Sequence, residues 1–134
     1  MQGTDSCSIT TQVNAVYGLS ADADLRFLVG RELIQICIGR HQAAMHFFPE
    51  GVSILIETEI TCRTPDGQAK RFETIPESAP MLVSLLNAVV THVSVRPPGT
   101  LRLEFDSDHT VEIEDTSTSY ESYQIRNGDQ LIVV

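Results

Sequence analysis

Two stretches of the sequence repeat one pattern, and this repeat constrains the fold more than any other feature. Each stretch contains an apolar run, a break, a strand that ends in Phe, a tight turn and an Ile/Val-rich strand that ends in Glu. The first stretch starts at Gly30, and the second runs from Asn87 to Ile125. Apolar and polar residues alternate with a period close to two, which indicates β-strands with one apolar face. The sequence therefore predicts two similar antiparallel meanders.

A three-stranded meander with one apolar face is too small to be stable alone. Two such meanders can cover each other's apolar faces as a sandwich or a partly open barrel. The chain of 134 residues fits one domain, and no linker separates the copies. We therefore expect a single mainly β domain over residues 1–134, with a pseudo-repeat of about 25–62 and 80–125 in which residues 31–60 and 88–116 superpose.

The positions of the apolar residues predict how the strands of the second hairpin pair. These residues are odd-numbered on both strands, so a three-residue loop over residues 107–109 would place Phe105 opposite Val111. Asp108 tolerates the left-handed conformation that such a loop needs near its end.

The first hairpin needs a different loop, because its two strands have apolar residues of opposite parity. A two-residue loop, Glu50-Gly51, would pair Phe47 with Ile54, and Gly51 would supply the positive φ of the tight turn. The two hairpins are thus expected to differ by one loop residue and to bury equivalent pairs.

The segments that lead into the two meanders also match. "LRFLVG" precedes the first and "LVSLLN" the second, so Gly30 and Asn87 occupy the same place and both suit a left-handed helix end. Ser78 as N-cap and Pro80 in the first turn predict a short helix around 78–87 before the second meander. A buried strand over "PMLVSLLNAVV" is the alternative. The first approach is expected to form only a turn of helix.

Two further segments are expected to lie at sheet edges. The turn "TPDG" leads into "QAKRFETI", whose charges suggest a short edge strand. Asn127-Gly128 signals a hairpin, and the apolar end "QLIVV" is expected to pair in the sheet. Both edges could pair with a second copy, so a homodimer is expected, with a monomer as the alternative.

Charge and cysteine usage limit the classes of function. The net charge of −9, from 18 acidic and 9 basic residues, disfavours nucleic-acid binding. No run of about 18 apolar residues predicts a membrane span, and the start of the chain lacks the pattern of a secretory signal. Three cysteines without a CxxC spacing agree with a cytoplasmic protein, in which Cys37 is expected to be a small buried apolar residue.

No catalytic constellation is recognisable in the sequence. The four histidines form no metal-binding motif and are interpreted as surface or rim residues, and Ser122 lies in no nucleophile elbow. The motif of Tyr120, Glu121, Ser122 and Tyr123 is interpreted as structural, with Tyr rings filling the edge of the core. We therefore assign no catalytic, cofactor-binding or metal-binding residue and expect a protein that is not an enzyme.

Four acidic residues form the candidate interaction face: Glu104, Asp106, Glu112 and Glu114. The predicted register puts Glu104 directly opposite Glu112 on the outer side, where like charges are destabilising. A surface that carries this cost predicts recognition of a basic partner. An exposed face that tolerates the repulsion through screening is the alternative.

The patterns "LVGRELIQICIGRHQ", "LRLEFDSDHTVEIED" and "YESYQI" resemble a bacterial family of small uncharacterised β-rich domains that end in a Tyr-Glu-Ser-Trp-like motif. The resemblance covers about residues 25–134, with Tyr123 where Trp is usual and Asp108 where a turn Gly is usual. It implies a β-rich fold and no established activity, and similar architectures occur among immunity proteins encoded beside secreted toxins.

Two functional hypotheses follow. The leading hypothesis is a non-enzymatic binding or interaction protein, of which an immunity-type inhibitor of a basic toxin is a specific form. The alternative is a β-barrel carrier of a small ligand, with a cavity lined by Phe47 and Phe105.

Overall fold

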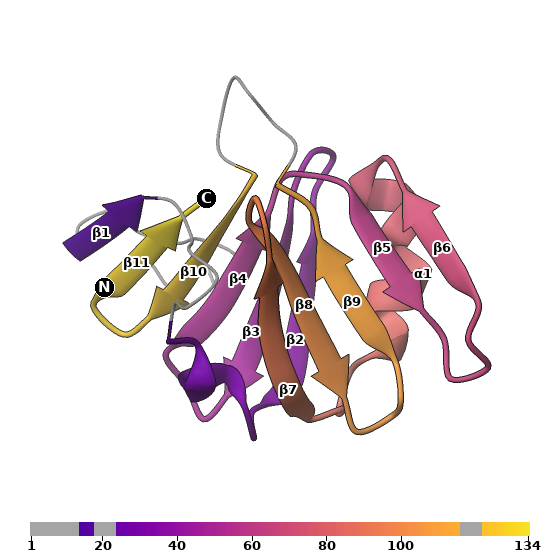
Figure 1. Cartoon of the computed structure of the whole chain (residues 1–134), viewed down its shortest axis with the longest axis horizontal. Coiled ribbons are helices and arrows are strands. Elements are labelled where there is room, and N and C mark those ends of the chain that lie inside the picture. The colour runs from indigo at the N-terminus through magenta and orange to yellow at the C-terminus, as the bar shows by residue number, and fades with distance from the viewer. Residues whose placement is uncertain (1–13, 18–23, 116–121) are drawn as a thin grey trace.

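The chain folds into two β-sheets that face each other as a sandwich (Figure 1). The structure is a computed structural model that describes residues 14–17, 24–115 and 122–134. Sheet A has the strand order β1 (Asn14–Tyr17), β11 (Gln130–Val133), β10 (Tyr123–Asn127), β4 (Val52–Ile56), β3 (Ala43–Phe48) and β2 (Glu32–Ile38). Sheet B has the order β6 (Ala69–Phe72), β5 (Ile60–Arg63), β9 (Thr110–Ile113), β8 (Thr100–Phe105) and β7 (Val90–Arg96). The predicted mainly β fold is confirmed, and the described strands form a sandwich rather than a closed barrel.

The predicted repeat appears as one meander in each sheet. Strands β2, β3 and β4 pair consecutively in sheet A, and β7, β8 and β9 pair consecutively in sheet B. The first strand of each meander has a bulge at the equivalent place, between Leu33 and Gln35 in β2 and between Val90 and His92 in β7. The same pattern of residues therefore produces the same local irregularity twice.

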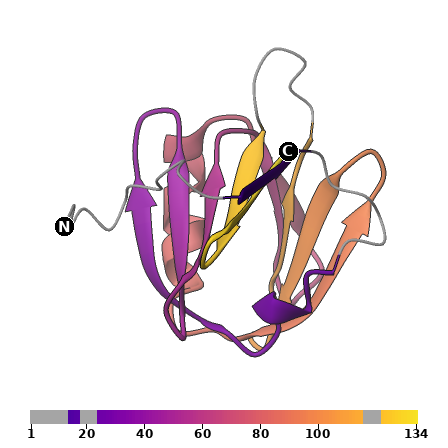
Figure 2. The same ribbon diagram turned by 90° about the vertical axis from the view of Figure 1, so that its left-hand side faces the viewer.

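The two meanders meet where their first strands begin, at the lower end of the view in Figure 2. The Gly30 amide donates to the Val90 carbonyl at 2.8 Å, and the Asn87 amide donates to the Leu33 carbonyl at 2.8 Å. These reciprocal bonds relate the halves as a pseudo-twofold axis would. Gly30 has a φ of 87° and Asn87 a φ of 76°, so both adopt the predicted left-handed conformation.

The fourth strand of each half crosses to the opposite sheet. Strand β5, which follows β4 of sheet A, pairs with β9 of sheet B, and β10, which follows β9, pairs with β4. Each sheet is thus completed by a strand from the other half, and one hydrophobic cluster fills the space between the sheets. The apolar faces that a single meander would leave in water are buried in this way.

The second hairpin turns one residue earlier than predicted. Leu103 lies opposite Val111, and the Phe105 amide donates to the His109 carbonyl at 3.0 Å, so the loop comprises residues 106–108. The expected pairing of Phe105 with Val111 is wrong, although the loop has three residues and the apolar faces are as predicted. The cause is Asp108, which has a φ of 66° and takes the last loop position, where this turn needs a left-handed residue.

The first hairpin also turns one residue earlier. Phe47 lies opposite Val52, so the expected pairing of Phe47 with Ile54 is wrong. In the predicted register Pro49 would occupy a ladder position, but proline has no amide hydrogen to donate. The turn includes Pro49 instead, and Gly51 has a φ of 101°. Both hairpins are shifted in the same direction, so the buried pairs remain equivalent.

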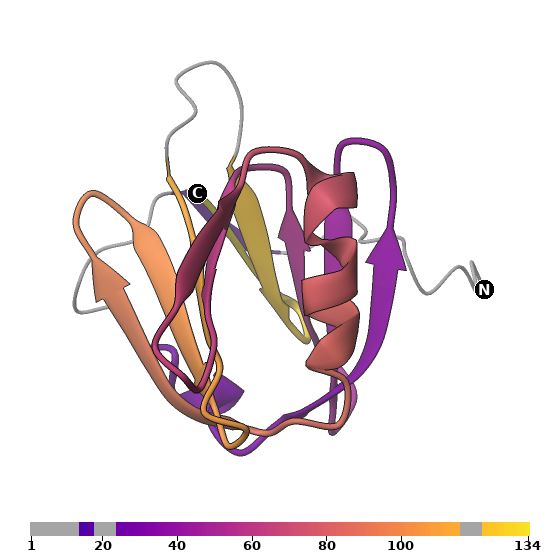
Figure 3. The same ribbon diagram turned by 90° about the vertical axis from the view of Figure 1, so that its right-hand side faces the viewer.

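The helix α1 (Ile75–Ser84) begins before its predicted start (Figure 3). Thr74 is the N-cap residue and Pro76 lies in the first turn. Ser78, predicted to be the cap, lies inside the helix, where its hydroxyl donates to the Ile75 carbonyl at 2.7 Å. Pro80, predicted for the first turn, also lies inside it. The helix packs along the side of the sandwich against β2, β5 and β6.

The other approach segment forms only the short 3-10 helix η1 (Arg26–Leu28), as predicted. Leu28 and Leu85 occupy matching places in the two approach segments, and both are fully buried. The turn of helix and the longer helix therefore anchor the two halves in the same core.

The edges of the sheets agree with the prediction in part. Strand β6 is an edge strand of sheet B, as expected. Strands β10 and β11 form the predicted C-terminal hairpin, with Asn127 opposite Gln130. The expectation that "QLIVV" is an edge is wrong, because the backbone of β1 pairs with β11 in parallel.

Candidate functional site

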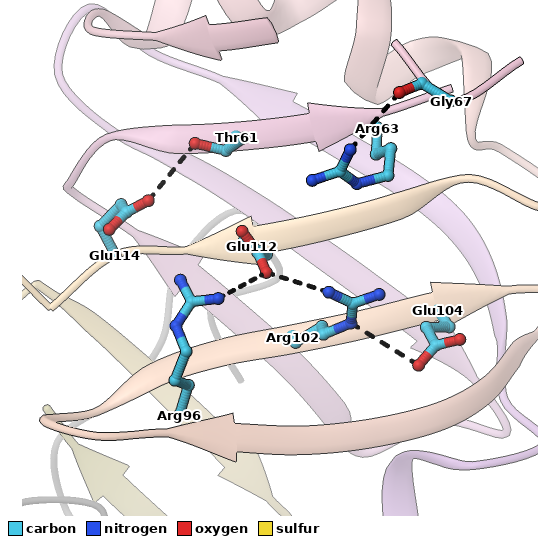
Figure 4. Close-up of polar contacts among 8 residues, drawn as sticks. All are labelled: Thr61, Arg63, Gly67, Arg96, Arg102, Glu104, Glu112 and Glu114. Atoms are coloured by element: carbon cyan, nitrogen blue, oxygen red, sulfur yellow. Dashed lines mark hydrogen bonds and ion pairs between the residues drawn. The ribbon is translucent and has the colours of Figure 1, made fainter. Parts of the chain in front are cut away.

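The outer side of sheet B carries an array of charged side chains, which we call the charged face (Figure 4). These side chains lie on β5 to β9 or directly beside these strands, and alternate with residues that point into the core. The face consists of four arginines and four glutamates: Arg63, Arg71, Arg96, Arg102, Glu59, Glu104, Glu112 and Glu114. Three of the four predicted interaction residues therefore lie on it.

Glu112 is the centre of the charged face. It lies opposite Arg102, and its Oε2 accepts hydrogen bonds from Nη1 of Arg102 at 3.2 Å and from Nη1 of Arg96 at 3.1 Å. Its side chain is only 12% exposed, whereas that of Arg96 is 59% exposed. Glu112 is therefore held by two guanidinium groups at the surface.

Glu104 does not oppose Glu112, so the predicted clash of like charges is wrong. Glu104 lies opposite Thr110, and its Oε2 is 3.6 Å from Nε of Arg102. The shift of the hairpin register is the physical reason, because moving the pairing by two positions brings Arg102 opposite Glu112. Exposed ion pairs contribute only about 0.2–1 kcal/mol each to the free energy of unfolding. What distinguishes the charged face is therefore the geometry of this network, more than its contribution to the free energy of unfolding.

Asp106 has a local structural role. It lies in the β8–β9 loop, where its Oδ1 accepts a hydrogen bond from the Val89 amide at 3.0 Å. The Asp106 amide in turn donates to the Val89 carbonyl at 2.8 Å. These two bonds tie the loop to the start of β7, so Asp106 does not belong to the charged face.

Glu114 has a hydrogen-bond partner on β5. Its Oε2 accepts a hydrogen bond from the Thr61 hydroxyl at 3.3 Å. The pKa of the nearby Arg71 is raised above its ordinary value, first by its hydrogen bond with Glu59 and then by the charges of Glu59, Glu114 and Glu73. The four predicted residues thus differ in their hydrogen-bond and ion-pair partners.

The C-terminal motif is only partly within the described residues, since Tyr120 and Glu121 lie outside them. Tyr123 is fully buried, and its hydroxyl donates to the Gly99 carbonyl at 2.5 Å. Burial raises the pKa of Tyr123, so the phenol stays protonated at neutral pH. The Ser122 hydroxyl donates to Oδ1 of Asp115 at 3.4 Å. These contacts agree with the structural interpretation of the motif.

The outer side of sheet A has a polar pocket that the sequence did not indicate. Gln35, His46, Ser53 and Arg126 lie directly opposite one another on β2, β3, β4 and β10. Together with Ile34 and the two turns that contain Gly51 and Gly128, they line a pocket of about 380 Å³. This volume is at the lower end of the range for small-molecule sites, about 300–1,000 Å³.

His46 has an unusual environment in this pocket. Its Nε2 atom is buried and has no hydrogen-bond partner, and burial lowers the pKa of the imidazole, so the ring is neutral at pH 7. A buried polar atom without a partner costs about 1–3 kcal/mol of stability. Local periodicity only placed His46 between the inward residues Met45 and Phe47. It could not show that Nε2 of the ring would be buried.

The other histidines agree better with the expected surface positions. His41 and His92 are exposed, and Nδ1 of His109 lies 3.0 Å from the Ser107 hydroxyl.

Among residues 14–17, 24–115 and 122–134, no group of three or more His, Cys, Asp or Glu side chains is arranged to hold a metal ion. Within the same ranges, no helix has the length and apolar character needed to cross a membrane.

The cysteines differ from the expectation. Cys37 is disulfide-bonded and only partly buried, so its prediction as a small buried apolar residue is wrong. Cys62 is the buried free cysteine of the described residues, and burial raises the pKa of its thiol to about 12. A thiol with this pKa is protonated and unreactive at neutral pH. Because one cysteine is in a disulfide, the cysteines no longer support the predicted cytoplasmic location.

Comparison with known proteins identifies the family of the chain. No curated protein and no solved structure matches the sequence. A family model matches residues 25–134, from the segment before η1 to the last residue, which is the extent covered by both meanders and the crossed strands. The chain therefore belongs to DUF6188, a family of unknown function.

Proposed function

We propose that the chain is a non-enzymatic binding domain and that a protein partner contacts the charged face of sheet B. The observation that carries the proposal is the arrangement around Glu112, which Arg96 and Arg102 hold in a fixed position at the surface. Side chains ordered before binding lose less conformational entropy when a partner arrives. A face whose charges are already paired with one another therefore favours specific association.

The charge pattern of this face constrains the partner. Four arginines and four glutamates lie on this face, so a uniformly basic surface would meet four like charges. A complementary partner instead presents both acidic and basic groups. An immunity-type inhibitor is one form of such a protein, and a toxin encoded beside this gene is the first partner to test.

The packing of the core favours a binding surface over a cavity between the sheets. A ligand cavity between the sheets would need Phe47 and Phe105 in its walls. Instead, these residues are 1% and 2% exposed and belong to the continuous hydrophobic cluster. The outer faces are therefore the surfaces on which recognition is proposed.

A charge swap tests the proposal. Arg102→Glu combined with Glu112→Arg keeps an internal ion pair but reverses the pattern shown to a partner. The matched control swaps the exposed pair of Asp24 and Arg26, whose Oδ1 and Nε atoms are 3.0 Å apart. Immobilised variants are exposed to the candidate toxin and to lysate of the source cell, and bound proteins are identified by mass spectrometry.

The proposal expects a partner that binds the wild type and the control swap but not the swap on the charged face. Thermal unfolding checks that each variant is folded. Arg63→Glu is a second variant of the charged face. It leaves the network around Glu112 intact, because Arg63 is exposed and makes no ion pair with Glu112. Equal capture of the same partner by all variants, or no partner specific to the wild type, would overturn the proposal.

A further inference from the structure

The outer side of sheet A buries apolar side chains that do not belong to the core. Among the described residues, three buried apolar residues lie outside the hydrophobic core cluster: Ala44 at 2% exposure, Leu131 at 3% and Val133 at 6%. Their strand neighbours Ala43 and Ile132 belong to the core cluster. Because successive side chains of a strand point to opposite faces, the three residues point outward. The outer side of sheet A is therefore shielded from water at these positions.

The position of these residues in the sheet does not explain their burial. Strand β11, which carries Leu131 and Val133, is next to the edge of sheet A, yet both of its faces are buried. On β8 of sheet B, which has a strand on either side, the outward side chains of Arg102 and Glu104 are still 35% and 39% exposed. The helix α1 packs against β2, β5 and β6 instead. Another segment of the chain must therefore cover the outer side of sheet A.

The cysteines identify the covering segment. The sequence contains three cysteines. Cys37 on β2 is disulfide-bonded, whereas Cys62 is free and buried. The remaining cysteine, Cys7, lies outside the described residues. By elimination, Cys7 is the partner of Cys37 within the chain, so the disulfide ties the N-terminal segment to β2.

The length of this segment matches the width of sheet A. Strands β1 and β2 are the opposite edges of the six-stranded sheet, and five spacings of about 4.8 Å put them about 24 Å apart. Cys7 precedes Asn14, the first residue of β1, by seven positions, and an extended chain of that length spans about 24 Å. A segment held at Cys37 on one edge and by β1 on the other therefore has just enough length to cross the sheet.

We propose that residues 7–13 form a strap over the outer side of sheet A, fastened by a disulfide between Cys7 and Cys37 at one edge and by β1 at the other. The row of side chains that starts at Cys37 is mainly apolar and uncharged, as a surface covered by the chain itself should be. The strap contributes the apolar residues Ile9 and Val13 to this contact.

The disulfide makes the strap sensitive to reduction. A dithiol transfers two electrons and two protons to the disulfide, which becomes two thiols, while the dithiol closes to its own disulfide. The reduced strap remains attached only through β1, so it should leave the sheet and expose the three outward apolar residues. The thiol of Cys62 takes no part in this exchange, because it is buried and protonated at neutral pH.

Peptide mapping tests the fastening. The folded full chain is alkylated without a reductant, digested and analysed by mass spectrometry. The expected result is one linked pair of peptides that contains Cys7 and Cys37. An alkylated Cys7, or a disulfide that joins two chains, would overturn the proposal.

The accessibility of methyl groups tests the cover. A soluble gadolinium chelate is added to the full chain with ¹³C-labelled methyl groups, and paramagnetic relaxation is measured by NMR. In the oxidised wild type, the three outward residues should be as protected as their inward neighbours Ala43 and Ile132. In Cys7→Ser, relaxation should increase severalfold at the outward residues and stay unchanged at the inward ones.

Two controls complete the test. Wild type reduced with dithiothreitol should behave like Cys7→Ser, which keeps the proposal testable if the variant fails to fold. Cys62→Ala, which removes a cysteine outside the disulfide, should keep the outward residues protected. Unchanged protection in both Cys7→Ser and the reduced wild type would overturn the proposal, and so would an equal increase at the inward residues. None of these measurements involves the charged face, so the strap and the proposed function can fail independently.

Discussion

Comparing the two sheets shows which positions of the repeat have the same kind of residue in both halves and which positions differ. Inward positions keep the same character in both halves: Met45 and Phe47 of sheet A correspond to Leu103 and Phe105 of sheet B, and all are nearly fully buried. Outward positions have diverged. His46 in sheet A occupies the place of Glu104 in sheet B. The core therefore needs both copies to remain alike, whereas each outer face can acquire its own chemistry.

The difference is clear in two matching rows of side chains. The row of sheet B that is centred on Glu112 contains Ser94, Arg102, Glu112, Thr61 and Arg71. The matching row of sheet A contains Cys37, Ala44, Leu55, Gln124 and Val133. One row presents charges of both signs, and the other is mainly apolar and uncharged. This contrast predicts how substitutions will differ between the two outer faces.

The largest effect is expected at the inward positions. Phe47→Ala and Phe105→Ala should each lower the free energy of unfolding by about 3–5 kcal/mol, because both create a cavity in the same core. The exposed neighbour Phe48, at 54% exposure, is the control, and Phe48→Ala should change stability by less than about 0.5 kcal/mol. Urea denaturation measures all three. A loss below about 1 kcal/mol for either core variant would break the equivalence of the halves.

A smaller effect is expected on the charged face. Glu112→Gln should lower the free energy of unfolding by about 1 kcal/mol, because it weakens the bonds to Arg96 and Arg102. Glu104→Gln should change it by less than about 0.5 kcal/mol, since this glutamate has one longer ion pair. The loss in Glu112→Gln should shrink in high salt. A gain of stability in Glu112→Gln would instead indicate the clash of like charges that the sequence suggested.

The smallest effect is expected in the polar pocket. His46→Leu removes a buried nitrogen without a partner, so stability should stay constant or rise by up to about 1 kcal/mol. His92 on β7 is the matched control, because it is exposed and lies opposite Glu104. His92→Leu should change stability by less than about 0.5 kcal/mol. A clear loss of stability in His46→Leu would show that the ring makes a stabilising hydrogen bond, and the comparison of the two faces would need revision.

The sequence predicted the strands and their inward faces because these depend on local alternation and on residues such as Gly30 and Asn87. It also contained the information for the two turns. The absence of an amide hydrogen on Pro49 and the left-handed tendency of Asp108 are local properties, and both place the turns one residue earlier than parity alone suggested.

The crossing of the fourth strands could not be predicted in the same way. The pairing of β5 with β9 and of β10 with β4 depends on which distant strand each one meets, and periodicity does not encode that choice. The candidate sites depend on such pairings. Arg102 lies opposite Glu112 only in the observed register, and Nε2 of His46 is buried where β2 and β4 flank β3.

The central claim, that Arg102 lies opposite Glu112 on the outer face of sheet B, depends on the register of β8 and β9. An NMR measurement of nuclear Overhauser effects between the α-protons of these strands tests it directly, because directly opposite residues in alternate pairs have α-carbons only about 4.5 Å apart. We expect a strong effect between Arg102 and Glu112 and a second between Glu104 and Thr110. A strong effect between Glu104 and Glu112 would contradict the account, since it would place the two glutamates opposite each other.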